Sequence, residues 1–168
     1  MNPNCSACRT TRPKAFDSVQ EYSIRCSLER FGLPSEAVSF FCSTLTRAKS
    51  AVITEHGPTK QFPVLSSVRQ GDPCAPLIFI MVADVLHRGY GELCKGQGAG
   101  YTFRNGEPLT VSSCGYADDV MIFAETNDGL LDLHQWTREF FGAHSFKLNT
   151  KKTKLTGTSL DGLHDSFY

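Results

Sequence analysis

The sequence predicts an α+β protein in which an antiparallel sheet carries its helices on one face. Three observations support this fold class. Short segments of strand-like composition are joined in pairs by turn sequences, stretches of helical periodicity separate these pairs, and the elements follow the order helix, helix, hairpin, helix, strands, helix, strand. Strands linked as hairpins argue against a doubly wound parallel sheet, in which single strands alternate with helices.

The composition indicates one compact domain without a membrane partner. The chain has 168 residues, 40% of them hydrophobic, and 17 basic side chains balance 17 acidic ones. A formal net charge of zero gives no overall attraction to nucleic acids or membranes, so such a partner must be recognised by local features. No stretch approaches the ~18 apolar residues needed to span a bilayer, and the N-terminus has no apolar signal region. We therefore expect an intracellular protein, nuclear or cytoplasmic, that is not secreted.

The cysteines favour a reducing compartment. There are seven, an odd number, and most lie in apolar stretches where a reduced thiol packs as a small hydrophobic group. Cys5 and Cys8 form a lone C-x-x-C without a second pair or a nearby histidine. An unpaired polar segment is therefore favoured over a zinc site.

The N-terminal segment gives no signal for regular structure. Residues 1–13 are polar, contain Pro3 and Pro13, and show neither helical nor strand periodicity. We expect an irregular lead-in here, an ordered domain over residues 14–156 and a C-terminal tail over residues 157–168.

Two helices are predicted next. Ser18 to Glu21 has the S-x-x-E form of a capping box, and this helix would end at Gly32. Ser35 can cap a second helix, in which apolar residues have the spacing i, i+3, i+4 and i+7: Val38, Phe41, Cys42 and Leu45.

A hairpin and a long helix follow. Residues 50–55 and 60–66 flank the turn sequence His56-Gly57-Pro58-Thr59, and Pro63 places the second strand at a sheet edge. Residues 73–94 are apolar on nearly all sides, which predicts a buried helix closed by the glycine-rich segment 89–100.

The second half of the chain predicts strands around two aspartates. Residues 101–105 and 109–113 form another hairpin pattern, and residues 116–124 predict a strand, a turn and a strand. Asn127 or Asp128 caps the following helix, and a basic strand near residues 151–156 ends the domain.

The adjacent aspartates are the first candidate site. Asp118 and Asp119 begin the apolar run Val120 to Phe123, which is typical of a central strand covered by helices. At ~4 Å two unit charges repel by ~4 kcal/mol at an effective dielectric near 20, so a cation is expected beside them. Carboxylates suit Mg²⁺, and two such ions can clamp the attacking and leaving oxygens of a phosphoryl transfer. The alternative is a polar hairpin turn without chemistry.

A second candidate site precedes the long helix. Ser67-Val68-Arg69-Gln70-Gly71-Asp72-Pro73 offers a cation, an amide that donates and accepts, and a glycine that permits close backbone approach to a ligand. Taken alone, this segment is more ordinarily a turn with Pro73 at the first helical position.

Four motifs in order resemble the reverse transcriptase domain of non-LTR, LINE-type retrotransposons. They are Lys14-Ala-Phe-Asp-Ser-Val, Ser67-Val-Arg-Gln-Gly-Asp-Pro, Tyr116-Ala-Asp-Asp and Leu148-Asn-Thr-Lys-Lys-Thr-Lys. The resemblance implies an RNA-directed DNA polymerase, a nucleotidyltransferase of right-hand fold, with this chain as most of the palm. It also implies an RNA template, a DNA primer and deoxynucleoside triphosphates as partners, and Mg²⁺ as cofactor, with Mn²⁺ as a substitute.

The resemblance further implies roles for individual residues. Asp118 and Asp119 would be the catalytic residues and hold both metal ions at the tip of a β-hairpin. Phe16 matches the steric gate, whose ring fills the space that a ribose 2′-OH needs. The remaining matches would contact the nucleotide or template: Arg69, Gln70, Gly71, Tyr116 and Lys152.

The chain departs from the family at a third metal ligand. Five residues before Phe16, where the family has an aspartate, this chain has Thr11, which is neutral and a poor ligand for Mg²⁺. The chain also begins shortly before Phe16 and ends soon after Lys154, so we expect fingers and thumb to be largely missing, and a longer chain could supply them. The expected result is a truncated palm with impaired polymerisation.

Two other functions stay open from the sequence. The first is a non-catalytic remnant that binds nucleic acid. The missing carboxylate at residue 11 and the absent thumb favour it. The second belongs to another class: a palm-like nucleotidyl cyclase, or an unrelated α+β interaction domain in which Asp118 and Asp119 form a turn.

Overall fold

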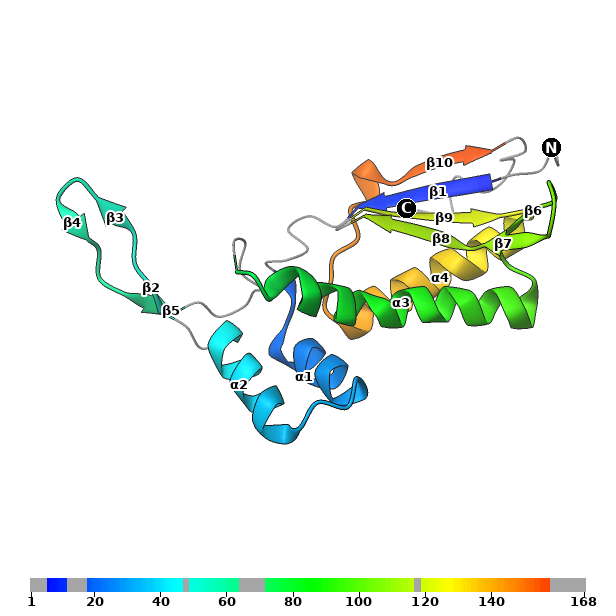
Figure 1. Cartoon of the computed structure of the whole chain (residues 1–168). Helices are drawn as coiled ribbons and strands as arrows, with labels where there is room; N and C mark the ends of the chain where they lie inside the picture. The colour runs from blue at the N-terminus through cyan, green and yellow to red at the C-terminus, as the bar shows by residue number, and fades with distance from the viewer. Residues whose placement is uncertain (1–5, 12–17, 47–48, 64–71, 117–118, 158–168) are drawn as a thin grey trace. The chain divides into compact units, whose positions relative to one another are not determined.

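The structure, a computed structural model, describes residues 6–11, 18–46, 49–63, 72–116 and 119–157 (Figure 1). The chain divides into two compact units, one formed by Met1–Pro13 with Asp84–Tyr168 and the other by Lys14–Ala83. The predicted domain bounds, residues 14–156, stay a prediction.

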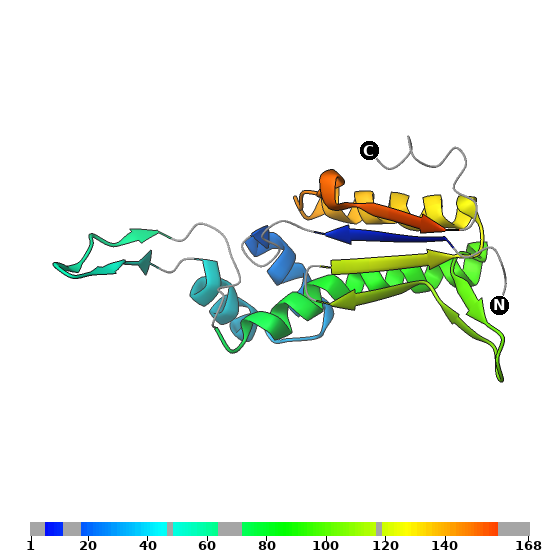
Figure 2. The ribbon, with the colours of Figure 1, turned by 90° about the horizontal axis from the view of Figure 1, so that it is seen from above.

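The first unit is built on a four-stranded antiparallel sheet with the order β10-β1-β9-β8. Its strands are β1 (Ser6–Thr11), β8 (Ser113–Tyr116), β9 (Asp119–Ala124) and β10 (Lys154–Gly157), and a 3-10 turn, η2 (Thr150–Lys152), precedes β10. Helix α4 (Asn127–Ala143) and the second half of α3 (Ala75–Gln97) cover the same face of the sheet (Figures 1 and 2). The prediction of a mixed fold with antiparallel strands is confirmed.

Strand β1 corrects the prediction that residues 1–13 are irregular. It pairs with β9 on one side and β10 on the other, so it lies inside the sheet. Its buried side chains are the small residues Ser6, Cys8 and Thr10, of which Thr10 donates a hydrogen bond to the carbonyl of Val120 at 3.3 Å. Such residues give no hydrophobic alternation, and the strand exists because partners distant in the sequence supply its hydrogen bonds.

Strand β9 is central, as predicted, but helices cover only one of its faces. Val120, Ile122 and Ala124 are buried, whereas Met121 is 38% exposed and Phe123 is partly exposed. The apolar run therefore alternates between the helix-covered face and the opposite face, here termed the open face. The open face carries Asp119 and Met121 of β9 and the exposed Arg9 of β1.

Helix α3 continues through the glycines that were expected to end it. It reaches Gln97, and Gly98 follows with a φ of 68°. Gly89 stands within the helix because the ring of Trp136 in α4 lies against it, and Trp136 Nε1 donates to the carbonyl of Leu86 at 3.0 Å. The contact between α3 and α4 explains why residue 89 is a glycine, since the helix does not end there.

The other connections of the first unit agree with the sequence except at one cap. The hairpin of β6 (Tyr101–Phe103) and β7 (Leu109–Val111) is present as predicted. The N-cap of α4 is Thr126, whose hydroxyl accepts from the amide of Gly129 at 3.1 Å, and not Asn127 or Asp128 as expected.

The described residues of the second unit include two helices, a hairpin and the first part of α3. The helices are α1 (Glu21–Arg30) and α2 (Ser35–Thr46), and the hairpin pairs β2 (Lys49–Ser50) with β5 (Phe62–Pro63) and β3 (Ile53–Thr54) with β4 (Gly57–Pro58). The helix predicted from Ser18 begins later, with Gln20 as a cap that makes no side-chain bond. Gly32 follows its end with a φ of 78°, as predicted.

The part of α3 in the second unit is not buried on all sides. Ile78, Phe79 and Val82 are buried, but Leu77 and Ile80 are 61% and 63% exposed. The expectation of a fully buried helix is therefore wrong for this half. No helix in the described parts of the chain combines the length and the hydropathy needed to cross a membrane.

Candidate active site

The β8–β9 hairpin carries the first candidate site. Tyr116 and Asp119 are the last paired residues before the turn, and Tyr116 is 86% exposed. The two strands predicted here are therefore present, and Asp119 is the first residue of β9. Asp118 lies outside the described residues.

Strand β1 brings a distant residue to this tip. The backbone of Thr11 pairs directly with that of Asp119, at the end of a ladder that runs from Ser6 and Ala124. The sequence resemblance gives Thr11 the position of an absent carboxylate, and the register puts this position beside Asp119. Sequence reasoning identified the position but could not show the pairing, because it treated β1 as irregular.

An ion pair between Arg9 and Asp119 lies on the open face. Arg9 Nη2 donates to Asp119 Oδ2, although Arg9 is the cross-strand partner of Met121 and reaches Asp119 diagonally. The two side chains are 50% and 36% exposed. Sequence reasoning missed Arg9, since only the register of β1 against β9 reveals the pair.

A second cation stands on the other side of Arg9. Lys154 of β10 is its direct cross-strand partner, and both residues are exposed. Like charges directly opposite each other are destabilising in a sheet, which favours the turn of Arg9 away from Lys154 and toward Asp119. Lys151 and Lys152 are exposed in the adjacent η2 turn, so the predicted role of Lys152 stays a prediction.

A close contact beneath the hairpin fixes strand β8 on α3. A β-carbon at Gly115 would lie 2.8 Å from His87 Nε2, and His87 Nδ1 is 3.0 Å from the hydroxyl of Ser113. A larger residue at position 115 would therefore require the His87 ring to shift. Sequence reasoning assigned no role to Gly115 or His87.

The described residues do not fit a divalent metal ion. They contain no group of three or more His, Cys, Asp or Glu side chains that could hold one. The carboxylate of Asp119 is already paired with a guanidinium, and Thr11 contributes no negative charge beside it. An Mg²⁺ ion bound to Oδ2 of Asp119 would have to displace this pair.

Five other predicted site residues cannot be located by the structure. Phe16, Arg69, Gln70, Gly71 and Asp118 lie outside the described residues.

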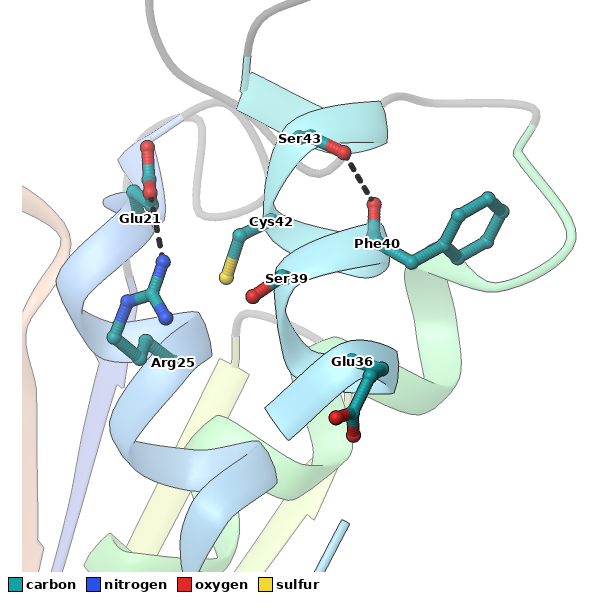
Figure 3. Close-up of a pocket in the computed structure, with 7 residues that line it drawn as sticks. All are labelled: Glu21, Arg25, Glu36, Ser39, Phe40, Cys42 and Ser43. Atoms are coloured by element: carbon teal, nitrogen blue, oxygen red, sulfur yellow. Dashed lines mark hydrogen bonds and ion pairs between the residues drawn. The ribbon is translucent and has the colours of Figure 1, made fainter. Parts of the chain in front are cut away.

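A cavity of about 390 Å³ lies between α1 and α2 in the second unit (Figure 3). Arg25 and Glu21 form an ion pair at 3.2 Å, and Ser43 donates to the carbonyl of Phe40 at 2.9 Å. Cys42 and Ser39 point toward α1, while the ring of Phe40 points away from it. The ion pair lies within α1 and the hydrogen bond within α2, so neither of them links the two helices across the cavity.

Comparison with known proteins gives one family. Residues 13–162 match the family described as reverse transcriptase (RNA-dependent DNA polymerase). The chain is similar to the Retrovirus-related Pol polyprotein from type-2 retrotransposable element R2DM of Drosophila melanogaster, with 32% identity over 144 residues. The aligned stretch is 86% of this chain and 13% of that protein. A Pol polyprotein from retrotransposable element R2 of Popillia japonica is 26% identical over 139 residues, or 83% of this chain and 22% of that protein.

Solved structures show the same fold at low identity. The apo telomerase of Candida tropicalis superposes with a TM-score of 0.70 at 12% identity, over 96% of this chain and 30% of the telomerase chain. The telomerase of Candida albicans, solved with a fragment of telomeric RNA, gives a TM-score of 0.69 at 10% identity, over 92% of this chain and 27% of that one. The chain thus spans a minor part of the proteins that it matches.

Proposed function

Because the chain belongs to the reverse transcriptase (RNA-dependent DNA polymerase) family, we propose that it is the palm of an RNA-directed DNA polymerase whose catalysis is impaired by Thr11. It is a reverse transcriptase domain related to the Pol proteins of R2 non-LTR retrotransposons. The proposed reaction is extension of a DNA primer along an RNA template with deoxynucleoside triphosphates, inside the cell, in the nucleus or the cytoplasm.

The pairing of Thr11 with Asp119 carries this proposal. A two-metal polymerase places carboxylates where they can share ions that stabilise both the attacking and the leaving oxygen. The strand that ends at Thr11 lies against the strand that begins at Asp119, so an aspartate at residue 11 would stand next to the pair. A threonine there contributes no negative charge at the position beside Asp119.

The other proposed roles follow the family resemblance. Asp118 and Asp119 are the catalytic carboxylates and the proposed ligands of Mg²⁺, which the family generally uses. Phe16 is the proposed steric gate. Contacts to nucleotide and template are proposed for Arg69, Gln70, Gly71, Tyr116 and Lys152.

Primer extension on an RNA template tests the proposal, with Mg²⁺ and with Mn²⁺. We expect weak or no extension by the unaltered chain, and a gain in Thr11→Asp that Asp118→Ala abolishes in the same background. Thr156→Asp is the matched control, because it adds a carboxylate at an exposed position of β10 that pairs with Ala7 and is remote from Asp119. A gain in Thr156→Asp equal to that in Thr11→Asp would contradict the role of residue 11.

A second candidate function is nucleic-acid binding without catalysis. The exposed cations of β1, η2 and β10 favour it: Arg9, Lys151, Lys152 and Lys154. If this function holds, the logarithm of the RNA binding constant should fall linearly with the logarithm of the salt concentration. Thr11→Asp should then incorporate no nucleotides with either Mg²⁺ or Mn²⁺. Incorporation by Thr11→Asp would reject it as the sole function.

A further inference from the structure

We infer that Arg9 is a built-in counter-ion of Asp119, which lowers the affinity of this carboxylate for divalent cations. The inference rests on the proposed function, because it concerns a carboxylate to which that function assigns metal binding. It adds a residue that the family resemblance does not name.

The geometry of the pair supports this role. Arg9 Nη2 and Asp119 Oδ2 are in direct contact, from neighbouring strands whose register is fixed over six paired positions. Both side chains lie on the open face, with Arg9 two residues before the end of β1 and Asp119 at the start of β9. The guanidinium therefore stands where a cation would approach Asp119.

The surrounding charges strengthen the effect. Lys154 is directly opposite Arg9 in the sheet, so the β1 and β10 side of Asp119 carries two positive charges. Thr11, the paired residue across from Asp119, is uncharged. Among the described residues, the local balance thus favours an arginine as the partner of Asp119 over a doubly charged metal ion.

The chemistry of the two cations makes them competitors. A guanidinium is charged at any working pH and donates through a planar fork that matches a carboxylate. Mg²⁺ requires near-ideal octahedral geometry and loses its water reluctantly, so it does not readily displace a group already bonded to the same oxygen. A metal ion that binds Oδ2 of Asp119 must displace Arg9, and one that binds Oδ1 is repelled by the guanidinium beside it.

Solvent limits the size of the effect. Arg9 and Asp119 are 50% and 36% exposed, and water screens their interaction. We expect removal of the Arg9 charge to tighten divalent binding on the order of tenfold.

Titration of the unaltered full chain with Mn²⁺ alone, followed by electron paramagnetic resonance of free Mn²⁺ at low ionic strength, tests this inference. The variants are Arg9→Gln, Arg9→Met as a second removal of charge, and Arg9→Lys, which keeps the charge. Arg104→Gln is the matched control, because Arg104 forms a comparably exposed ion pair with Glu125 at 3.2 Å elsewhere in the first unit. Circular dichroism verifies that each variant is folded.

The expected result is a gain of on the order of tenfold in Arg9→Gln and Arg9→Met, with Arg9→Lys and Arg104→Gln close to the unaltered chain. Adding Asp119→Asn to Arg9→Gln should remove the gain. No change in Arg9→Gln and Arg9→Met, a gain that survives Asp119→Asn, or tight Asp119-dependent binding by the unaltered chain would each overturn the inference.

This measurement separates the inference from the proposed function. It uses no primer, template or nucleotide, so a failure of primer extension does not affect its outcome. Conversely, Thr11→Asp can gain polymerisation while Arg9→Gln leaves Mn²⁺ affinity unchanged, in which case only the inference fails.

Discussion

The ring of Trp136 lies against the backbone of Gly89, so closely that a β-carbon at residue 89 would be 2.1 Å from Cε2 of the indole. Since Trp136 Nε1 also donates to the carbonyl of Leu86, the indole is held over one turn of α3 and cannot easily move aside. This contact sets the spacing of the two helices that cover the sheet.

Gly89→Ala should therefore destabilise the protein, by about 1–3 kcal/mol, because the added methyl forces the indole or the helix to shift. Chemical denaturation measures the change in the free energy of unfolding. Gly91→Ala and Gly96→Ala are matched controls in the same helix, since a β-carbon there meets no heavy atom within 4 Å. These controls should be neutral or more stable by up to about 1 kcal/mol, owing to the higher helix propensity of alanine. Equal effects at the three positions would contradict the packing argument.

Tyr90 and Thr137 couple the same two helices through a buried hydrogen bond. Their hydroxyl oxygens are 2.7 Å apart, both residues are fully buried, and Thr137 donates onward to the carbonyl of Leu133 at 2.8 Å. Tyr90→Phe and Thr137→Val should each cost about 1 kcal/mol or more, and the double variant should cost less than their sum. Denaturation of all four proteins gives the coupling energy, and strict additivity would show that the bond does not contribute.

His134 should make the stability fall at acidic pH. Burial, with a further contribution from the charge of Arg138, lowers the pKa of His134 to about 4 from its ordinary value near 6.5. The unfolded chain therefore binds a proton between pH 6.5 and 4 that the folded protein does not, and the free energy of unfolding should decrease by about 3 kcal/mol as pH falls through this range.

The test compares the pH dependence of denaturation in His134→Leu and in the unaltered chain. The variant should lose the His134 component of the slope between pH 6.5 and 4, whatever its stability at neutral pH. His56→Leu is the control for the replacement of a histidine by leucine, because the His56 side chain is 89% exposed. An unchanged slope in His134→Leu would rule out this assignment.

Phe16→Val should relax the discrimination against ribonucleotides if Phe16 is the steric gate. The smaller side chain leaves space for a 2′-OH, so the ratio of deoxynucleotide to ribonucleotide incorporation should drop by ~10-fold or more. The measurement requires a background that extends a primer, and Thr11→Asp is the expected one. Phe31→Val, at an aromatic residue after α1 that is 45% exposed, should leave the ratio unchanged. Equal ratios in Phe16→Val and its background would remove Phe16 from the proposed site.

Most helices and the family could be predicted from the sequence. Helical periodicity and turn residues predict α1, α2, α3 and α4 and the existence of the hairpins, because these signals are local and depend on neighbours within a few residues. Two strand bounds were wrong: Gly57–Pro58, expected in a turn, form β4, and the basic strand expected near residues 151–156 begins at Lys154 after the η2 turn. The ordered motifs gave the reverse transcriptase family, which the family match confirms. Even the position of Thr11 was found from its spacing to Phe16.

Only the tertiary structure decided what lies beside Asp119. Strand β1 has small, polar buried residues and owes its conformation to β9 and β10, so no local pattern could predict it. The register of that strand pairs Thr11 with Asp119 and brings Arg9 into contact with the same carboxylate. Likewise, the glycine at position 89 of a helix is explained by the ring of Trp136, which leaves no space for a β-carbon. Such pairings depend on residues far apart in the chain, and their geometry is fixed by packing and hydrogen bonds that form only in the folded protein.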